Sequence, residues 1–334
     1  MTIPVLGLDI GGANLKAAHT DGNARTVAFP LWKHPERLSE EIVRLCAVMP
    51  PYDRLAVTMT GELCDCFGTK REGVRAILES VCPAAECFPV RVWTTRGLFL
   101  NCEEALLTPL RVAAANWLAL AHYVGRQFPT EIVLLIDSGS TTTDVTYIHR
   151  GVPQPHGLID PGRMASGELM YTGVRRTPIC AVLGPAVAAE FFATMQDAYL
   201  LCGMVPENPS DCDTADGRPA TVPFAHARMA RMRCADVEMF CAEEARDLAE
   251  QALQAQWRAV QKALERVVAD KPAVERIVVA GSGEVLGRSV HARTSGWSQL
   301  PITSLADLLG PDLSEAACAY AVAVLAGQEI SDER

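Results

Sequence analysis

Residues 7–16 read Gly7-Leu8-Asp9-Ile10-Gly11-Gly12-Ala13-Asn14-Leu15-Lys16, and residues 135–144 repeat the design as Leu135-Ile136-Asp137-Ser138-Gly139-Ser140-Thr141-Thr142-Thr143-Asp144. Each copy has an apolar strand, an aspartate, a glycine-containing turn and a second, more polar strand. The glycines let backbone N–H groups approach phosphate oxygens without an intervening Cβ, and the aspartate can hold Mg²⁺. The repeat therefore predicts two phosphate-binding β-hairpins.

A third glycine turn extends the pattern. After the apolar strand Ile277-Val278-Val279-Ala280 comes Gly281-Ser282-Gly283-Glu284, which can admit a nucleotide or another flat diphosphate-bearing ligand against the backbone. We expect Mg²⁺ at the two repeat aspartates, Asp9 and Asp137. The predicted diphosphate-binding set is Gly11, Gly12, Asn14, Lys16, Gly139, Ser140, Thr141, Thr142, Thr143, Gly281, Ser282, Gly283 and Glu284.

The simpler alternative is a pair of ordinary hairpins whose Asp and Gly residues only form turns. The run Ser140–Asp144 disfavours it, because four hydroxyl residues followed by an aspartate are poor core material.

Length and charge narrow the class of protein. With 334 residues and 36.0 kDa the chain exceeds the size of a single growing core, so we expect two lobes, at residues 1–130 and 131–334. A net charge of −10 argues against a nucleic-acid partner. No apolar stretch approaches a membrane span and no secretory signal is recognisable, so we expect a cytoplasmic protein without a membrane partner. The oligomeric state stays open, a homo-oligomer included.

Hydrophobic periodicity predicts strands and helices in alternation. Helices are expected over residues 111–124 and 184–204, and a long one over Ala242–Val268, with Leu253, Trp257 and Val260 on its apolar stripe. Residues 206–223 are rich in Asn, Asp, Gly and Pro and read as an exposed loop. Such a long loop inside a compact domain is typical of a lid or binding element.

The order and spacing of the three turns resemble the phosphate-1, phosphate-2 and adenosine motifs of the actin, sugar kinase and Hsp70 superfamily. This resemblance implies an α/β, two-lobed, actin-like (ribonuclease H-like) fold. A narrower group is similar in four segments: the hydantoinase A/oxoprolinase-like "tetrahydromethanopterin-linked C1 transfer pathway" proteins, whose archaeal members build the aminomethylfuran–phenol ether of methanofuran. The segments are 58–65, 113–117, 137–144 and 167–178, and shorter likenesses lie at 214–217, 233–236 and 281–284.

The narrower resemblance implies a transferase. An (aminomethyl)furanylmethyl diphosphate would lose pyrophosphate, and the phenol oxygen of a tyramine, tyrosine or glutamyl-conjugated acceptor would capture its methylene carbon. In a bacterium the same chemistry would belong to methylofuran assembly. Mg²⁺ near Asp9 and Asp137, together with backbone N–H donors, would neutralise the leaving pyrophosphate. The furan ring can stabilise a cationic methylene, so no strong nucleophile is needed.

Further polar residues are candidates for catalysis and substrate binding. Asp144, Asp160 and Glu168 are candidate bases for the phenol proton. Glu62 could bind the aminomethyl cation, and Tyr171 could stack on an aromatic ring. Arg175 and Arg176 could bind a carboxylate or phosphate. The alternatives are a helix-capping role for Glu62 and plain solvation for the arginines.

A different class of enzyme stays open. The same three motifs hold ATP in the wider superfamily, so an ATP-dependent small-molecule kinase or an ATP-driven amidohydrolase is the main alternative. Glu62 and Asp65 lie roughly where such kinases supply a base. Whether ATP or ADP binds is not decided by the sequence. A nucleotide-dependent chaperone or switch would need an additional domain, for which this length has no room.

Overall fold

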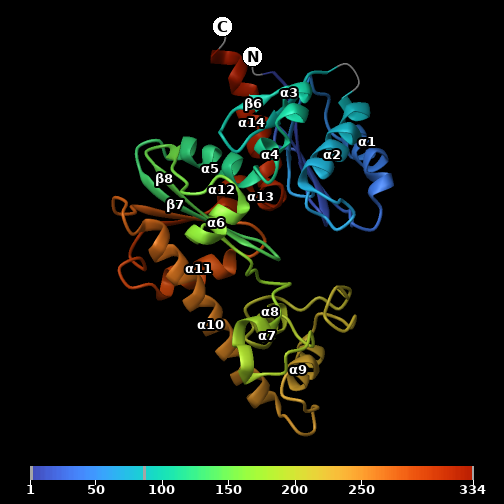
Figure 1. Cartoon of the computed structure of the whole chain (residues 1–334). Helices are drawn as coiled ribbons and strands as arrows, with labels where there is room; N and C mark the ends of the chain where they lie inside the picture. The colour runs from blue at the N-terminus through green and yellow to red at the C-terminus, as the bar shows by residue number, and fades with distance from the viewer. Residues whose placement is uncertain (1–2, 86–87, 333–334) are drawn as a thin grey trace. The chain divides into compact units, whose positions relative to one another are not determined.

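The computed structural model describes residues 3–85 and 88–332 and divides into two compact units (Figure 1). The first comprises Met1–Leu135, Thr146–Arg163 and Thr303–Arg334, and the second comprises Ile136–Val145 and Met164–Ile302. Two uninterrupted lobes were expected from the sequence, whereas residues 146–163 and 303–334 return to the first unit. In the described parts of the chain no helix is both long and apolar enough to cross a bilayer.

The sheet of the first unit has the order β3-β2-β1-β4-β5-β6. Only β2 and the short β6 run against their neighbours. The central strand β1 is buried along its whole length, as expected for a strand covered on both faces. The predicted actin-like α/β fold is thereby confirmed. The strands are β1 (Val5–Ile10), β2 (Asn14–His19), β3 (Ala24–Ala28), β4 (Arg54–Met59), β5 (Val90–Trp93) and β6 (Phe99–Leu100).

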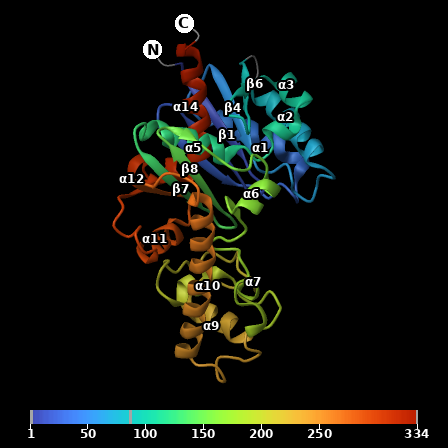
Figure 2. The same cartoon turned by 60° about the vertical axis from the view of Figure 1, so that its left-hand side comes forward.

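The last helix, α14 (Ala317–Asp332), packs on β1 and β4 of this sheet (Figure 2). The contact is very close, since a Cβ atom placed on Gly7 would lie 1.9 Å from the backbone oxygen of Ala319. Small residues on both sides let helix and strand approach in this way. This packing explains why the C-terminal segment belongs to the first unit.

Other helices of the first unit differ in part from the sequence prediction. In place of one helix over 111–124 there are α4 (Pro109–Val112) and α5 (Asn116–Gln127), separated by Ala114 with a φ of 48°. A helix cannot continue through a residue in the left-handed region. The remaining helices are η1 (Pro35–Arg37), α1 (Leu38–Ala47), α2 (Lys70–Ala85), α3 (Cys102–Leu107), α12 (Leu305–Leu309) and α13 (Pro311–Glu315).

The second sheet has the order β10-β8-β7-β11-β12, with β9 on β8. Its strands are β7 (Ile132–Ser138), β8 (Thr143–His149), β9 (Val152–Pro153), β10 (Leu169–Met170), β11 (Arg276–Ala280) and β12 (Ile302–Ser304). Helix α6 (Asp160–Ser166) lies between β9 and β10 in the sequence, and α11 (Glu284–Arg293) follows β11.

The long helix α10 (Ala242–Val268) has the predicted bounds. Figures 1 and 2 show α7 (Ile179–Leu183), α8 (Met195–Leu201) and α9 (Val222–Arg231) against it. One or two helices were expected over 184–204, and the structure has η2 (Gly184–Ala186) and α8 there; Thr194 and Asp197 form a capping box that starts α8 at residue 195.

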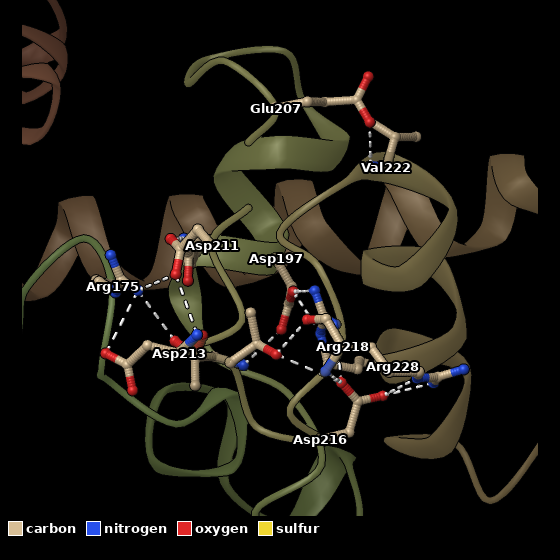
Figure 3. A network of polar contacts seen from close by, with 12 residues as sticks. Arg175, Asp197, Glu207, Asp211, Asp213, Asp216, Arg218, Val222 and Arg228 are labelled. Atoms are coloured by element: carbon tan, nitrogen blue, oxygen red, sulfur yellow. Dashed lines mark hydrogen bonds and ion pairs between the residues drawn. The ribbon is translucent and has the colours of Figure 1, made fainter. Parts of the chain in front are cut away.

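Ion pairs hold the loop between α8 and α9 (Figure 3). The fully buried Arg228 of α9 contacts Asp197 Oδ1 through Nη2 at 2.7 Å, and its Nη1 donates to Asp216 Oδ1 at 2.9 Å. Partial burial acts to raise the pKa of Asp216, but hydrogen bonds from Arg218 and Arg228 outweigh it and lower the pKa to about 2. The loop is therefore anchored at Asp216, and this carboxylate stays ionised until the pH falls toward that value.

Arg228→Ala should lower the free energy of unfolding by about 3–5 kcal/mol, because it leaves the buried Asp197 carboxylate without its countercharge. Urea unfolding at pH 7 measures the change. The control is Arg231→Ala on the same helix: this half-exposed arginine reaches Asp216 at 3.4 Å, and its loss should cost at most about 1 kcal/mol. Equal effects of the two substitutions would contradict the prediction.

Candidate diphosphate-binding turns

The two predicted hairpins close with the same hydrogen bond. The N–H of Gly11 donates to the carbonyl of Asn14 at 3.0 Å, and the N–H of Gly139 donates to the carbonyl of Thr142 at 2.8 Å. In each case the donor lies two residues after the repeat aspartate. The sequence repeat is therefore also a structural repeat, with one copy in each unit.

In each turn, the carbonyl of the residue three positions after the repeat aspartate accepts hydrogen bonds from a neighbouring segment. The N–H of Leu31 donates to Gly12 O at 2.9 Å, and the N–H groups of Arg175 and Arg176 donate to Ser140 O at 3.2 and 2.8 Å. In a trans peptide the C=O and N–H bonds point in opposite directions. The N–H groups of Ala13 and Thr141 thus point away from these partners, and neither has an acceptor among the described residues. Backbone N–H groups of this kind form anion-binding concavities.

Gly12 and Gly139 differ in the space that the surrounding residues leave for a Cβ atom. A Cβ atom on Gly12 would lie 2.7 Å from Cys64 Sγ, so a larger residue there would require the Cys64 side chain to move. A Cβ on Gly139 would meet only Thr142 O, at an ordinary 3.7 Å. The protein's own packing therefore does not demand glycine at 139.

Asp9 lies at the end of β1 and is buried. Within the described ranges its Oδ1 has no hydrogen-bond partner, nor has the buried hydroxyl of Thr58 on the adjacent strand β4. Burial raises the pKa of Asp9, and the charge of Lys16 partly offsets the shift. A bare, buried carboxylate oxygen fits a cation. Mg²⁺ typically takes one or two carboxylates together with phosphate oxygens, so it needs no larger protein cluster, and none occurs in the described residues.

In the second unit the structure brings the third turn against the repeat aspartate. Gly281 has a φ of +83°, and a Cβ there would lie 2.3 Å from Ser138 O and 2.5 Å from Asp137 Oδ1. The N–H of Gly283 donates to Ser138 O at 2.8 Å. Glu284 opens α11 and pairs with Arg288 at 3.5 Å, and Ser282 is exposed. Asp137, the 139–142 turn and the 281–283 turn are thus neighbours along the end of one strand.

A buried acid of the first unit has a lysine partner that the sequence did not reveal. Lys70 Nζ lies 2.6 Å from Asp160 Oδ2 and 3.5 Å from Glu62 Oε1. Glu62 is almost fully buried, and its Oε2 has no hydrogen-bond partner in the part of the chain that the structure describes. Burial raises the pKa of Glu62 against the opposing charge of Lys70. The candidate base Asp160 is therefore engaged by Lys70, and one buried oxygen of Glu62 has no hydrogen-bond partner among the described residues.

Glu62→Gln should stabilise the protein at pH 8 and have no effect at pH 4. Because the pKa of Glu62 is raised in the folded state, ionising this carboxyl lowers the free energy of unfolding. This loss of stability is present above the raised pKa and absent below the unfolded pKa of 4.5. Thermal unfolding temperatures of both proteins at the two pH values measure the difference. An equal shift at pH 4 and pH 8 would show that ionisation of Glu62 is not its cause.

The other predicted residues are placed as follows. Lys16 Nζ donates to Glu315 O at 2.7 Å, at the end of α13, so at least one of its three donors is occupied there. Glu168 is buried and accepts from Ser166 Oγ at 2.7 Å. Asp144 is half-buried on β8, and Tyr171 is 60% exposed. Asn14 begins β2, and Thr143 begins β8.

The two arginines after the second hairpin pair with carboxylates of the 206–221 loop, and Figure 3 shows Arg175 with Asp211 and Asp213. Arg175 Nη2 lies 2.6 Å from Asp211 Oδ1 and 3.3 Å from Asp213 Oδ2, and Arg176 Nη2 lies 3.6 Å from Asp213 Oδ2. Hydrogen bonds from Arg175 help to lower the pKa of Asp211 despite partial burial. An anionic ligand would have to compete with these aspartates for either arginine.

Fold and turns together define an actin-like α/β protein with phosphate-type turns. The hydantoinase/oxoprolinase profile matches residues 53–324, and the chain belongs to this family. It is 31% identical to a (4-{4-[2-(gamma-L-glutamylamino)ethyl]phenoxymethyl}furan-2-yl)methanamine synthase of Methanocaldococcus jannaschii, over 99% of both chains. A synthase of the same name from Methanococcus vannielii is 28% identical over 59% of this chain and 92% of its own. The family resemblance inferred from the motifs is confirmed.

Among solved structures, a nucleotide-free acetone carboxylase matches 96% of this chain and 70% of its own with a TM-score of 0.53. At 10% sequence identity this likeness concerns the fold alone.

Proposed function

We propose that the protein is a transferase of methanofuran or methylofuran biosynthesis. It would condense an (aminomethyl)furanylmethyl diphosphate with the phenol of a tyramine, tyrosine or glutamyl-tyramine acceptor and release pyrophosphate. The observation that carries the proposal is the 31% identity, over 99% of both chains, to a synthase whose name describes a phenoxymethyl-furan methanamine. The phenoxymethyl link in that name is the aryl ether that this reaction would form.

The bond changes are few. The C–O bond between the furan methylene and the diphosphate breaks and its electron pair leaves with pyrophosphate, while the phenol oxygen forms the new C–O bond. In either turn the outward N–H groups, of Ala13 or of Thr141, would donate to phosphate oxygens as their charge grows. Bound Mg²⁺ would supply further charge neutralisation, with Asp9 as the residue to hold it at the first turn and Asp137 as the residue to hold it at the second.

The remaining roles fall to carboxylates. Asp144, Asp160 and Glu168 are the candidate acceptors of the phenol proton; Asp144 is half-buried, Glu168 is buried and Asp160 pairs with Lys70. The buried Oε2 of Glu62 would accept a hydrogen bond from the ammonium of the aminomethyl group.

The test uses the purified protein with Mg²⁺, a furanylmethyl diphosphate and either tyramine or its glutamyl conjugate. A parallel reaction contains ATP and the acceptor without the diphosphate. Pyrophosphate and ether formed in equal amounts without ATP would support the transferase. No ether in the first reaction, with ADP appearing in the second, would overturn the proposal in favour of an ATP-dependent kinase or amidohydrolase.

A further inference from the structure

Gln256 is a polar residue on the buried side of helix α10. It is 1% exposed and shares the apolar stripe of the helix with Leu253 and Val260. Burying an amide without partners is costly, so a glutamine at such a position must be hydrogen-bonded. Its partners indicate what it does.

The amide of Gln256 uses its oxygen and both of its N–H bonds. Its Oε1 accepts from the hydroxyl of Tyr199 at 2.9 Å. Its Nε2 donates to Thr172 Oγ1 and to the carbonyl of Gly173, each at 2.9 Å. Tyr199 on α8 thereby orients the amide, and the amide in turn holds the chain at residues 172 and 173.

Residues 172–176, here called the clamp segment, hold the 139–142 turn. The N–H of Val174 donates to Gly139 O at 3.1 Å, and the two following N–H groups donate to Ser140 O. At the other edge Thr143 Oγ1 donates to Thr172 O at 2.7 Å. A Cβ on Gly173 would lie 2.6 Å from both Gly139 O and Ser140 O. A displaced clamp segment would therefore move these carbonyls and the N–H groups that point the opposite way.

We propose that Gln256 is a positioning residue for diphosphate binding, acting through the clamp segment on the 139–142 turn. The inference rests on the proposed function only in taking this turn as a phosphate site. Gln256 itself touches no substrate in this scheme. Its effect is to keep the donors of the turn fixed before the ligand arrives.

Gln256→Leu keeps the approximate volume and removes all three hydrogen bonds. Its dissociation constant for inorganic pyrophosphate, measured by calorimetry with Mg²⁺, and its KM for the furanylmethyl diphosphate are expected to rise about 10- to 100-fold. The KM for the phenolic acceptor should stay unchanged. Tyr199→Phe, which removes only the orienting hydroxyl, should shift the same two constants in the same direction by less. Gln254→Leu, an exposed position of the same helix, is the matched control and should resemble the wild type.

The outcomes distinguish the positioning role of Gln256 from the proposed transferase function on which it rests. Wild-type protein that neither binds pyrophosphate nor forms ether would overturn the proposed function. A wild type that binds pyrophosphate while Gln256→Leu and Tyr199→Phe bind it equally well would overturn the positioning role alone. The positioning role would also fall if the acceptor KM rose in step with the diphosphate KM, since that indicates general loosening. Should Gln256→Leu fail to fold by circular dichroism, Tyr199→Phe decides.

Discussion

Asp9→Asn is expected to lower kcat at least about 100-fold while leaving the protein as stable as the wild type or more so. The carboxylate is buried with an oxygen that no described residue contacts by a hydrogen bond, and its raised pKa shows that the folded state disfavours its charge. A neutral amide of the same shape removes that cost at neutral pH. A residue whose loss stabilises the fold and stops the reaction is one retained for its chemistry.

Turnover of the diphosphate and thermal unfolding should be measured on the same preparations. Asp137→Asn is expected to lose activity similarly, and Asp53→Asn, an exposed position of the first unit, is the control. Near-normal turnover in Asp9→Asn or Asp137→Asn would remove the basis for metal and phosphate binding at that turn. Loss of activity together with loss of the folded state would assign Asp9 a structural role.

Gly281→Ala should abolish activity and also destabilise the second unit, by about 2–5 kcal/mol. The substitution adds a Cβ at a φ of +83° and places it 2.3 Å from Ser138 O and 2.5 Å from Asp137 Oδ1. Both neighbours lie at the end of β7, where the second phosphate turn begins. The methyl group would therefore push aside the repeat aspartate as well as strain the backbone.

Gly296→Ala separates the backbone strain from the displacement of Asp137. Gly296 has a φ of +81° with nothing among the described residues within 4 Å of the added Cβ, so it carries only the backbone cost, about 1–2 kcal/mol, and should keep full activity. Urea unfolding and pyrophosphate affinity are the readouts. If Gly281→Ala and Gly296→Ala had the same free energy of unfolding and the same pyrophosphate affinity, the close approach of the 281–283 turn to Asp137 would not matter for function.

The sequence predicts those parts of the fold that depend on local patterns. Both hairpins, the bounds of α10 and the order of the phosphate turns follow from residue spacing alone. Side-chain partners from distant segments do not, since nothing near Glu62 in the sequence indicates that Asp160 shares its lysine. Likewise, the 206–223 loop was recognised as a loop, but not the buried Arg228 that anchors it.

One missed residue did leave a signal. The apolar stripe of α10 was predicted to include Trp257, whereas Gln256 is the more deeply buried of the two. Leu253, Gln256 and Val260 are spaced three and four residues apart, which is the spacing of one helix face. A single amide on an otherwise apolar face marks a buried hydrogen-bond network, and this position could have been proposed from the pattern.

The close packing of α14 on β1 also sets an order of events during translation. Strand β1 leaves the ribosome long before the helix that meets Gly7 at Ala319. Until then one face of the nascent first sheet lacks its cover, and an uncovered apolar face is prone to aggregation. The segments of the second unit, residues 136–145 and 164–302, are all made before α14. A ribosome stalled before residue 317 would therefore hold a chain whose first sheet still lacks the cover of α14.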